Sequence, residues 1–186
     1  MILKNIPNFI SVVRIFLVAP VVILLLEERY GLALLIFAIA GVSDALDGYL
    51  AKRFNWTSHV GSILDPMADK LLLVCSYFTL AWLGHIPVWL VATVIARDVI
   101  IVVGAMAFYW LVGRYEMEPS WFSKINTFTQ IVLVLAVVAS LSIVPLGEST
   151  LDLVIYMVLV STVISGADYV WTWGRLAWRI KHRSRD

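Results

Sequence analysis

Two neighbouring segments decide the fold of this chain: Ser43-Asp-Ala-Leu-Asp-Gly-Tyr-Leu-Ala-Lys-Arg53 and Gly61-Ser-Ile-Leu-Asp-Pro-Met-Ala-Asp-Lys70. Together they hold four aspartates in an otherwise apolar part of the sequence. A carboxylate at the centre of a bilayer costs about 2.5–3.5 kcal/mol, so four uncompensated ones would cost roughly 10 kcal/mol. We therefore expect these carboxylates to face one another, water or a metal ion rather than lipid. They are Asp44, Asp47, Asp65 and Asp69.

The composition of the whole chain is that of a membrane protein. Of its 186 residues 61% are hydrophobic and only 15% are charged, and the mean hydropathy is +0.91. These values exclude an ordinary soluble domain. We expect one domain, residues 1–186, and no nucleic-acid partner, while the net charge of +1 itself says nothing about an acidic partner. A cleavable signal peptide is not expected, because Arg14 interrupts the first apolar run.

Apolar stretches of about 20 residues recur along the chain and predict an all-α polytopic membrane protein. We expect six transmembrane helices in one bundle, separated by charged loops or by turns such as the one that ends at Pro87. The expected helices are residues 7–26, 30–51, 61–83, 87–111, 124–143 and 151–174, followed by a basic tail at 175–186.

The lysines and arginines between these helices indicate the orientation of the chain. Nearly all of them lie at one end of the bundle, and Arg29 alone lies at the other. The positive-inside rule then places both termini in the cytoplasm, and it places the aspartates where water-soluble substrates reach them. The tail is either an amphipathic surface helix attracted to anionic lipid or only a topology signal. The cytoplasmic basic residues are Lys4, Lys52, Arg53, Arg114, Lys124, Arg175, Arg179, Lys181, Arg183 and Arg185.

The spacing of the aspartates favours divalent-metal chemistry on a phosphate. Asp44 and Asp47 are three residues apart and Asp65 and Asp69 four apart, so each pair shares a helix face. Two such faces can enclose one or two Mg²⁺ or Mn²⁺ ions, which prefer hard oxygen ligands and can clamp a pyrophosphate. A cation or proton pathway, as in a transporter, is the alternative that the carboxylates alone leave open.

The full pattern resembles the signature of the CDP-alcohol phosphatidyltransferase family. It reads DxxDGxxA, a basic residue, eight residues, then GxxxDxxxD, and this chain matches it from Asp44 to Asp69. Lys52 is a departure, since the family usually has Arg there; lysine keeps the charge but loses the bidentate fork. The opening Ile6-Pro-Asn8-Phe-Ile-Ser-Val-Val-Arg14 also looks like the first helix of the family.

This resemblance implies a fold, a reaction and a set of site residues. CDP-diacylglycerol would bind with its pyrophosphate on two metal ions, an acceptor hydroxyl would attack the phosphorus that bears the lipid, and CMP would leave. All four aspartates would be metal ligands, and Asp69 would also be the general base. A homodimer in a bacterial-type or mitochondrial inner membrane is expected on the same grounds. The residues expected at the nucleotide are Asn8, Gly48, Ala51, Lys52 and Gly61.

The acceptor alcohol depends on a second group of residues, with Arg97 inside the fourth helix and Lys124-Ile-Asn126-Thr127 at the start of the fifth. Branches of the family that use glycerol 3-phosphate typically have Lys-x-Lys-Thr and a further Arg, whose charges suit a dianionic phosphate. This chain lacks both and resembles the mitochondrial-type branch. We therefore favour phosphatidylglycerol as acceptor, giving cardiolipin, with glycerol 3-phosphate as the alternative.

Two arginines have two open interpretations each. Arg97 either binds the phosphate of the acceptor or forms an ion pair within the bundle, with the neighbouring Asp98 expected on a different helix face. Arg14 either contacts a substrate phosphate or pairs with an aspartate of the cluster. In both cases the cost of a membrane-embedded charge requires a partner.

Overall fold

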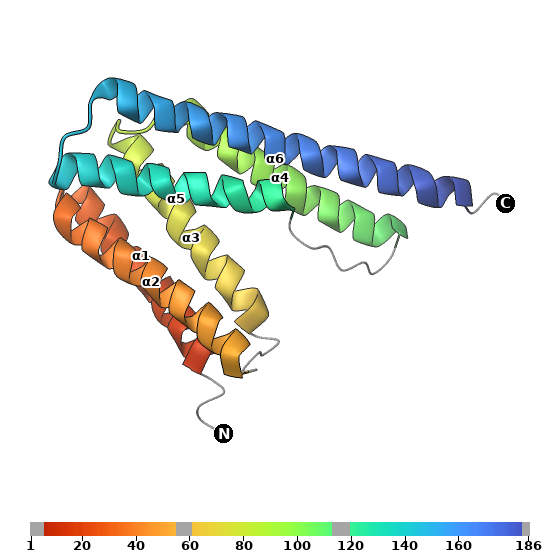
Figure 1. Ribbon diagram of the computed structural model, residues 1–186, viewed down its shortest axis with the longest axis horizontal. Coiled ribbons are helices and arrows are strands. Elements are labelled where there is room, and N and C mark those ends of the chain that lie inside the picture. Colours follow the sequence, from red (N-terminus) through yellow and green to blue (C-terminus); the bar gives the residue numbers. More distant parts are fainter. Residues whose placement is uncertain (1–5, 55–60, 113–119, 184–186) are drawn as a thin grey trace. The chain divides into compact units, whose positions relative to one another are not determined.

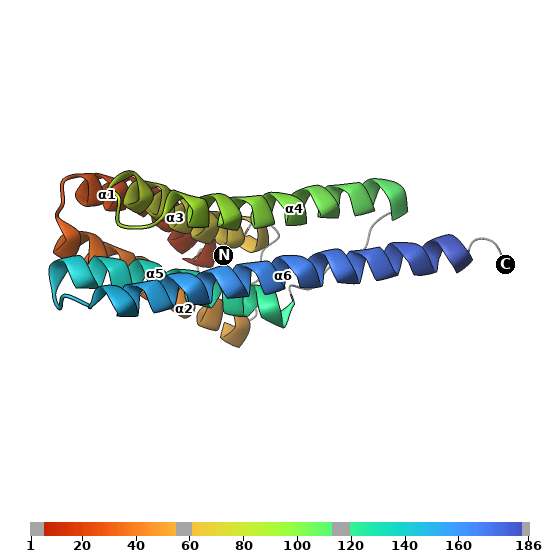
Figure 2. The same cartoon turned by 90° about the horizontal axis from the view of Figure 1, so that it is seen from above.

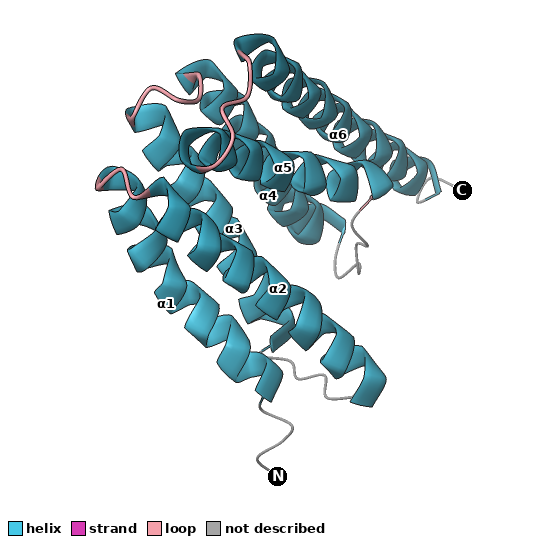
Figure 3. Cartoon of the chain, turned by 60° about the vertical axis from the view of Figure 1, so that its left-hand side comes forward, coloured by secondary structure: helices cyan, strands magenta, loops and turns pink. Residues whose placement is uncertain are grey.

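The computed structural model describes the backbone of residues 6–54, 61–112 and 120–183, and the side chains of residues 10–44, 53–54, 67–108, 110 and 120–175. Every regular element in these ranges is a helix (Figures 1 and 3). The helices are α1 (Ile6–Leu26), α2 (Tyr30–Phe54), α3 (Gly61–Trp82), α4 (Val88–Val112), α5 (Trp121–Ser142) and α6 (Glu148–Arg183).

The turn after α3 shows why one helix ends and the next begins. Gly84 adopts a left-handed backbone with φ of 79°, which costs glycine little because it has no Cβ. The amide of His85 donates to the carbonyl of Leu80 at 2.9 Å, so a carbonyl of the last helical turn is satisfied. Pro87 follows and lies directly before α4, where its missing N–H costs no helical hydrogen bond.

The chain divides into two compact units, which we describe separately. The first unit contains α1, α2, α3 and the part of α5 from Val134 onward. Within it α1 packs against both α2 and α3. Its core includes small and branched apolar side chains along these helices, and α1 lies close to the helices that carry the four aspartates. Buried members include Val18, Val21, Leu25, Ala33, Ala40, Ala68 and Leu80.

The second unit contains α4, the part of α5 up to Leu133, and α6. Figure 2 shows α4 and α6 side by side, with their N-terminal ends at the same end of the unit. Between them lies the ring of Trp173, whose centroid is 6.0 Å from those of Phe108 and Tyr169. A Cβ atom at Gly104 would come within 2.7 Å of this indole, so only glycine lets the ring lie where it does.

The predicted helices agree with the structure in number and, at most ends, to within a few residues. Within the described residues, the stretches long and apolar enough to cross a membrane are Val88–Phe108, Trp121–Ser142 and Glu148–Arg175, and shorter apolar stretches of α1 and α2 are Ile10–Leu26 and Tyr30–Asp44. The molecule is an integral membrane protein by this criterion. The helix α6 continues past the predicted end of the last span, near residue 174, to Arg183. The residues after Gly174 include no proline or glycine, and leucine, alanine, arginine and lysine favour helix.

Candidate functional site

A buried arginine joins two of the four aspartates in the first unit. Arg14 of α1 has only 1% of its surface exposed, and its Nη1 donates to Oδ1 of Asp44 at 2.6 Å. The same nitrogen contacts Oδ1 of Asp69. These two carboxylates belong to α2 and α3, the two helices against which α1 packs. The structure therefore brings Asp44 and Asp69 to one place, as their helix positions predict, and adds Arg14 between them.

Arg14 and the two carboxylates that it contacts differ in their exposure to solvent. The side chains of Asp44 and Asp69 are 42% and 40% exposed, whereas Arg14 is enclosed. The positively charged guanidinium is therefore buried beneath the site, and the two carboxylates lie on its solvent-accessible side. Of the two interpretations of Arg14, the ion pair with the aspartates is the contact that the structure contains.

The other residues predicted for this site have side chains outside the described part of the chain, and their roles stay predictions. The backbone nevertheless fixes their register. Asp47 lies about one helical turn after Asp44 on α2, and Asp65 about one turn before Asp69 on α3. The nucleotide-site positions lie on the same three helices: Asn8 on α1, Gly48, Ala51 and Lys52 on α2, and Gly61 at the start of α3.

The chemistry of the described donors fits a divalent cation. Asp44 and Asp69 offer hard carboxylate oxygens from two helices, close enough to contact one nitrogen atom, and such oxygens suit Mg²⁺ or Mn²⁺. Among the described residues no group of three or more His, Cys, Asp and Glu side chains gathers at ligand distance. The other two predicted ligands, Asp47 and Asp65, have side chains outside the described residues and stay predictions.

A second polar cluster surrounds Arg97 in the second unit. Arg97 of α4 is 6% exposed, and its Nη1 donates to Asp98 at 2.9 Å. Its Nη2 donates to Ser123 of α5 at 2.8 Å and also contacts Ser165 of α6, while its guanidinium carbon lies 5.8 Å from the ring centroid of Tyr169. One guanidinium thus connects three helices. Its Nε is buried and has no hydrogen-bond partner among the described residues.

This cluster adds residues that the sequence did not reveal. Asp98 is expected on a different helix face from Arg97, and the two side chains nevertheless form an ion pair at 2.9 Å. Ser123, Ser165 and Tyr169 were not predicted as partners of Arg97, since single small polar residues in apolar helices are common. A usable signal was present, because Ser161 and Ser165 are four residues apart and mark one polar face of α6.

Lys124 and Asn126 lie on different sides of α5. Lys124 is exposed, and its Nζ lies 5.3 Å from the ring centroid of Trp121. Asn126 is fully buried, and its Oδ1 accepts hydrogen bonds from Ser161 at 3.0 Å and Thr162 at 2.8 Å. Its Nδ2 has no partner among the described residues. The structure therefore does not bring Lys124 and Asn126 to one point.

Comparison with known proteins connects these residues to a family. A family model described as CDP-alcohol phosphatidyltransferase matches residues 4–173. A cardiolipin synthase (CMP-forming) of Rattus norvegicus is 37% identical over 154 residues, covering 73% of this chain and 50% of the relative. A probable phosphatidylglycerophosphate synthase of Mycobacterium tuberculosis is 32% identical over 178 residues, covering 90% of this chain and 81% of the relative. The chain thus spans about half the length of the cardiolipin synthase that it matches.

Proposed function

Because the chain belongs to the CDP-alcohol phosphatidyltransferase family, we propose that it transfers a phosphatidyl group from CDP-diacylglycerol to a glycerol-type acceptor and releases CMP. The observation that carries this proposal is the contact of Asp44 and Asp69 with one buried guanidinium. It supports a site in which carboxylates from two helices act together, as the aspartate spacing requires. The relatives named cardiolipin synthase and phosphatidylglycerophosphate synthase agree with a transferase of phospholipid synthesis.

The proposed reaction is a displacement at phosphorus. Asp69 accepts the proton of the acceptor hydroxyl, whose oxygen forms a bond to the phosphorus that bears diacylglycerol. The phosphoanhydride bond to CMP breaks, and its electron pair leaves with CMP. Arg14 holds the Asp69 carboxylate on its enclosed side, so that the remaining oxygen surface faces the open side of the site.

Mg²⁺ or Mn²⁺, two per site, would be held by Asp44, Asp47, Asp65 and Asp69. Such ions, when bound, neutralise the pyrophosphate and the leaving phosphate. The small residues Gly48, Ala51 and Gly61 let a nucleotide approach the helices closely, while Lys52 and Asn8 offer it polar contacts. We propose these roles from the register of the helices that carry them.

We propose phosphatidylglycerol as the acceptor and cardiolipin as the product. Asp98 already neutralises Arg97, Asn126 is a neutral amide inside the unit, and Lys124 is turned outward onto Trp121. Little uncompensated positive charge is therefore left for a dianionic phosphomonoester, and a monoanionic phosphodiester suits the site better. The relative named probable phosphatidylglycerophosphate synthase, which this chain matches over 90% of its length, favours glycerol 3-phosphate as the second candidate.

The proposal also covers the topology, the oligomeric state and the membrane of the protein. We infer one domain over residues 1–186 with all six helices in the membrane, both termini and the aspartates on the cytoplasmic side, and a homodimer as the working unit. The membrane is a bacterial-type inner membrane or the mitochondrial inner membrane. The lengths of the helices and the distribution of lysine and arginine support this topology.

A purified-protein assay tests the function. The full chain in detergent is given CDP-diacylglycerol, Mg²⁺ or Mn²⁺, and either phosphatidylglycerol or glycerol 3-phosphate, and CMP and lipid products are measured. We expect CMP and cardiolipin with phosphatidylglycerol. CMP release with glycerol 3-phosphate alone would overturn the cardiolipin proposal, and cation flux in liposomes without CMP release under any condition would indicate a transporter instead.

A further inference from the structure

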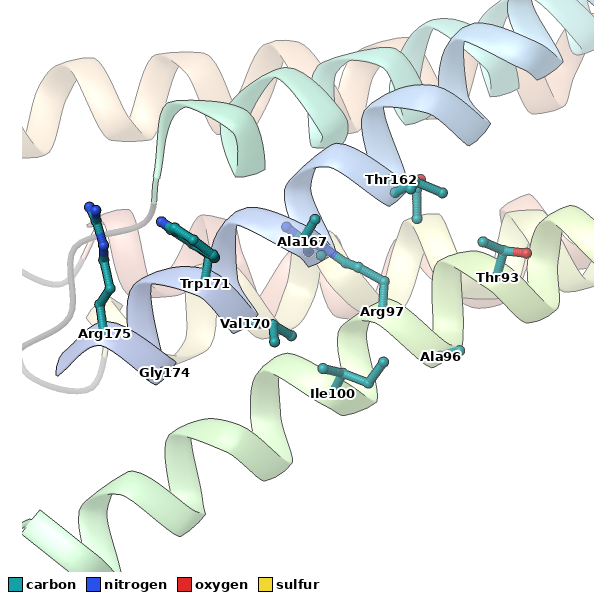
Figure 4. A pocket seen from close by; sticks show the side chains of 12 residues that line it. Thr93, Ala96, Arg97, Ile100, Thr162, Ala167, Val170, Trp171, Gly174 and Arg175 are labelled. Atoms are coloured by element: carbon teal, nitrogen blue, oxygen red, sulfur yellow. The ribbon is translucent and has the colours of Figure 1, made fainter. Parts of the chain in front are cut away.

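An elongated groove of about 840 Å³ lies between α4 and α6, within the second unit (Figure 4). One wall is the face of α4 from Thr93 to Ile100, and the other is the face of α6 from Thr162 to Arg175. Both walls belong to helices with a described stretch long and apolar enough to cross a membrane, and the basic residues that begin at Arg175 predict the end of the last span there. The groove therefore runs from inside the span to its end.

Small residues and one large ring explain why this space is hollow. Ala96 on α4 and Gly166, Ala167 and Gly174 on α6 line it and contribute little side-chain volume. Beside the groove the indole of Trp173 occupies the position where α6 would otherwise meet α4 at Gly104. The indole of Trp173 thus separates α4 from α6, and the small residues that line the groove do not fill the space between them.

The two ends of the groove differ in chemistry. Its interior is almost wholly apolar, because the guanidinium of Arg97 turns to Asp98 and the two serines and leaves its aliphatic stem against Gly166. At the other end the guanidinium carbon of Arg175 lies 5.2 Å from the ring centroid of Trp171. No acidic side chain lines the groove within the described part of the chain, so Arg175 brings a positive charge to its end.

We propose that this groove binds a phospholipid with an anionic headgroup, with an acyl chain along the apolar walls and the phosphate on Arg175. Arginine suits phosphate because its planar fork donates two parallel hydrogen bonds. Tryptophan and basic residues at the end of a span are the groups that lie at the headgroup level. The groove shares Arg97 with the predicted acceptor residues, but the proposal needs only that α4 and α6 lie in a membrane and does not depend on which acceptor the reaction uses.

A second groove offers a matched comparison. It lies between α5 and α6 with a volume of about 490 Å³, and no charged side chain lines it among the described residues. Val163 lines the first groove and Val160 the second, both on α6 and exposed to 56% and 55%. Tryptophan at either position fills one groove and leaves the other open. The two variants therefore carry the same substitution, valine to tryptophan, and differ only in which groove it fills.

The experiment is native mass spectrometry of the full chain released from nanodiscs of equal phosphatidylserine and phosphatidylcholine content. Phosphatidylserine is the anionic probe because phosphatidylglycerol is the proposed acceptor. We expect the native chain to retain phosphatidylserine preferentially, Val163→Trp to lose this bound lipid, and Val160→Trp to keep it. Arg175→Ala should reduce the preference for phosphatidylserine about fivefold, as expected for one basic residue at an anionic surface, and Arg175→Lys should keep most of it.

Three results would overturn the proposal: equal retention of both lipids by the native chain, equal behaviour of Val163→Trp and Val160→Trp, or a change of oligomer mass rather than lipid number in Val163→Trp. The last would show that a second copy of the chain covers the groove. Arg175 lies exposed at the end of the span, so its variants keep the test decisive even if a tryptophan variant fails to fold.

Discussion

The guanidinium of Arg14 is buried in the first unit, whereas the two carboxylates that it contacts are 42% and 40% exposed. This asymmetry has an energetic reason. A charged side chain inside a membrane costs about 2.5–3.5 kcal/mol unless it is compensated, and the carboxylates of Asp44 and Asp69 compensate it. The same contacts orient the two carboxylates, so one residue of α1 affects both the stability and the geometry of the site.

Replacement of Asp69 by asparagine should abolish turnover with the fold intact. The amide keeps the shape of the side chain but cannot take the proton of the acceptor, and a general base typically contributes about 10²–10⁴-fold. CMP release by purified Asp69→Asn measures the effect, and the melting temperature checks the fold. Asp152→Asn, at an exposed position on α6, is the control and should retain full activity. Native-like activity of Asp69→Asn would remove Asp69 as the base.

Replacement of Arg14 by methionine should destabilise the protein and make its stability depend on divalent cations. The change removes the buried cation that two carboxylates contact. We expect a loss of about 1–3 kcal/mol, less than for a fully buried pair because both carboxylates are partly solvated. Thermal unfolding with and without Mg²⁺ measures this, and Mg²⁺ should restore part of the loss. Arg14→Lys keeps the charge and should lose less; an Arg14→Met protein as stable as the native one would contradict the argument.

At the scale of the elements, the packing of α4 against α6 depends on one glycine and one indole. Trp173 lies against Gly104 and is held by Phe108 and Tyr169. Because the ring has neighbours on more than one side, it cannot move away from an added methyl group without disturbing them. Gly104 is therefore required by close approach and not by backbone conformation.

Gly104→Ala should destabilise the second unit by about 1–3 kcal/mol, the usual cost of overpacking. Gly41→Ala on α2 is the matched control, because a Cβ there meets nothing within 4 Å and alanine favours helix. Thermal unfolding of both variants makes the comparison, and Trp173→Leu in the Gly104→Ala background should recover part of the loss. Equal stability of the two alanine variants would contradict the close contact.

The elements were more predictable from sequence than the site. Hydropathy and turn residues predict six helices, because each apolar run is ended by charge, proline or glycine. The continuation of α6 to Arg183 was harder to predict, because basic residues mark the edge of a membrane without ending a helix. The aspartate spacing predicted that Asp44 and Asp69 meet. The partners of Arg97 could not be predicted, since a long, flexible arginine side chain can reach many positions, and here it contacts Asp98, Ser123 and Ser165 at once.

At the scale of the whole molecule, the four aspartates of the predicted site lie on α2 and α3. Within the described part of the chain, the candidate membrane spans lie in α4, α5 and α6. Helices α1, α2 and α3 have 21, 25 and 22 residues, which corresponds to roughly 32–38 Å. This length matches a hydrocarbon core of about 30 Å, so α1, α2 and α3 are also long enough to cross a membrane.

Cysteine labelling tests the proposed topology. In a Cys75→Ser background, Ser149→Cys at the start of α6 and Ser184→Cys after its end are matched single-cysteine variants. In intact cells or spheroplasts an impermeant maleimide should label position 149, and it should label position 184 only after permeabilisation. The reverse pattern would invert the orientation, and labelling of both positions from outside would contradict an α6 that crosses the membrane.

The contacts of Arg14 also bear on how the protein is made. Translation delivers Arg14 to the insertion machinery before Asp44 and Asp69 exist, so α1 first meets lipid with an uncompensated charge. We expect a nascent chain that stops after Leu26 to integrate poorly and one that stops after Trp82 to integrate stably, as measured by resistance to alkaline extraction. Equal integration of the two would contradict this order. The first three helices would then leave the insertion machinery together, and only after the ion pairs of Arg14 with Asp44 and Asp69 have formed.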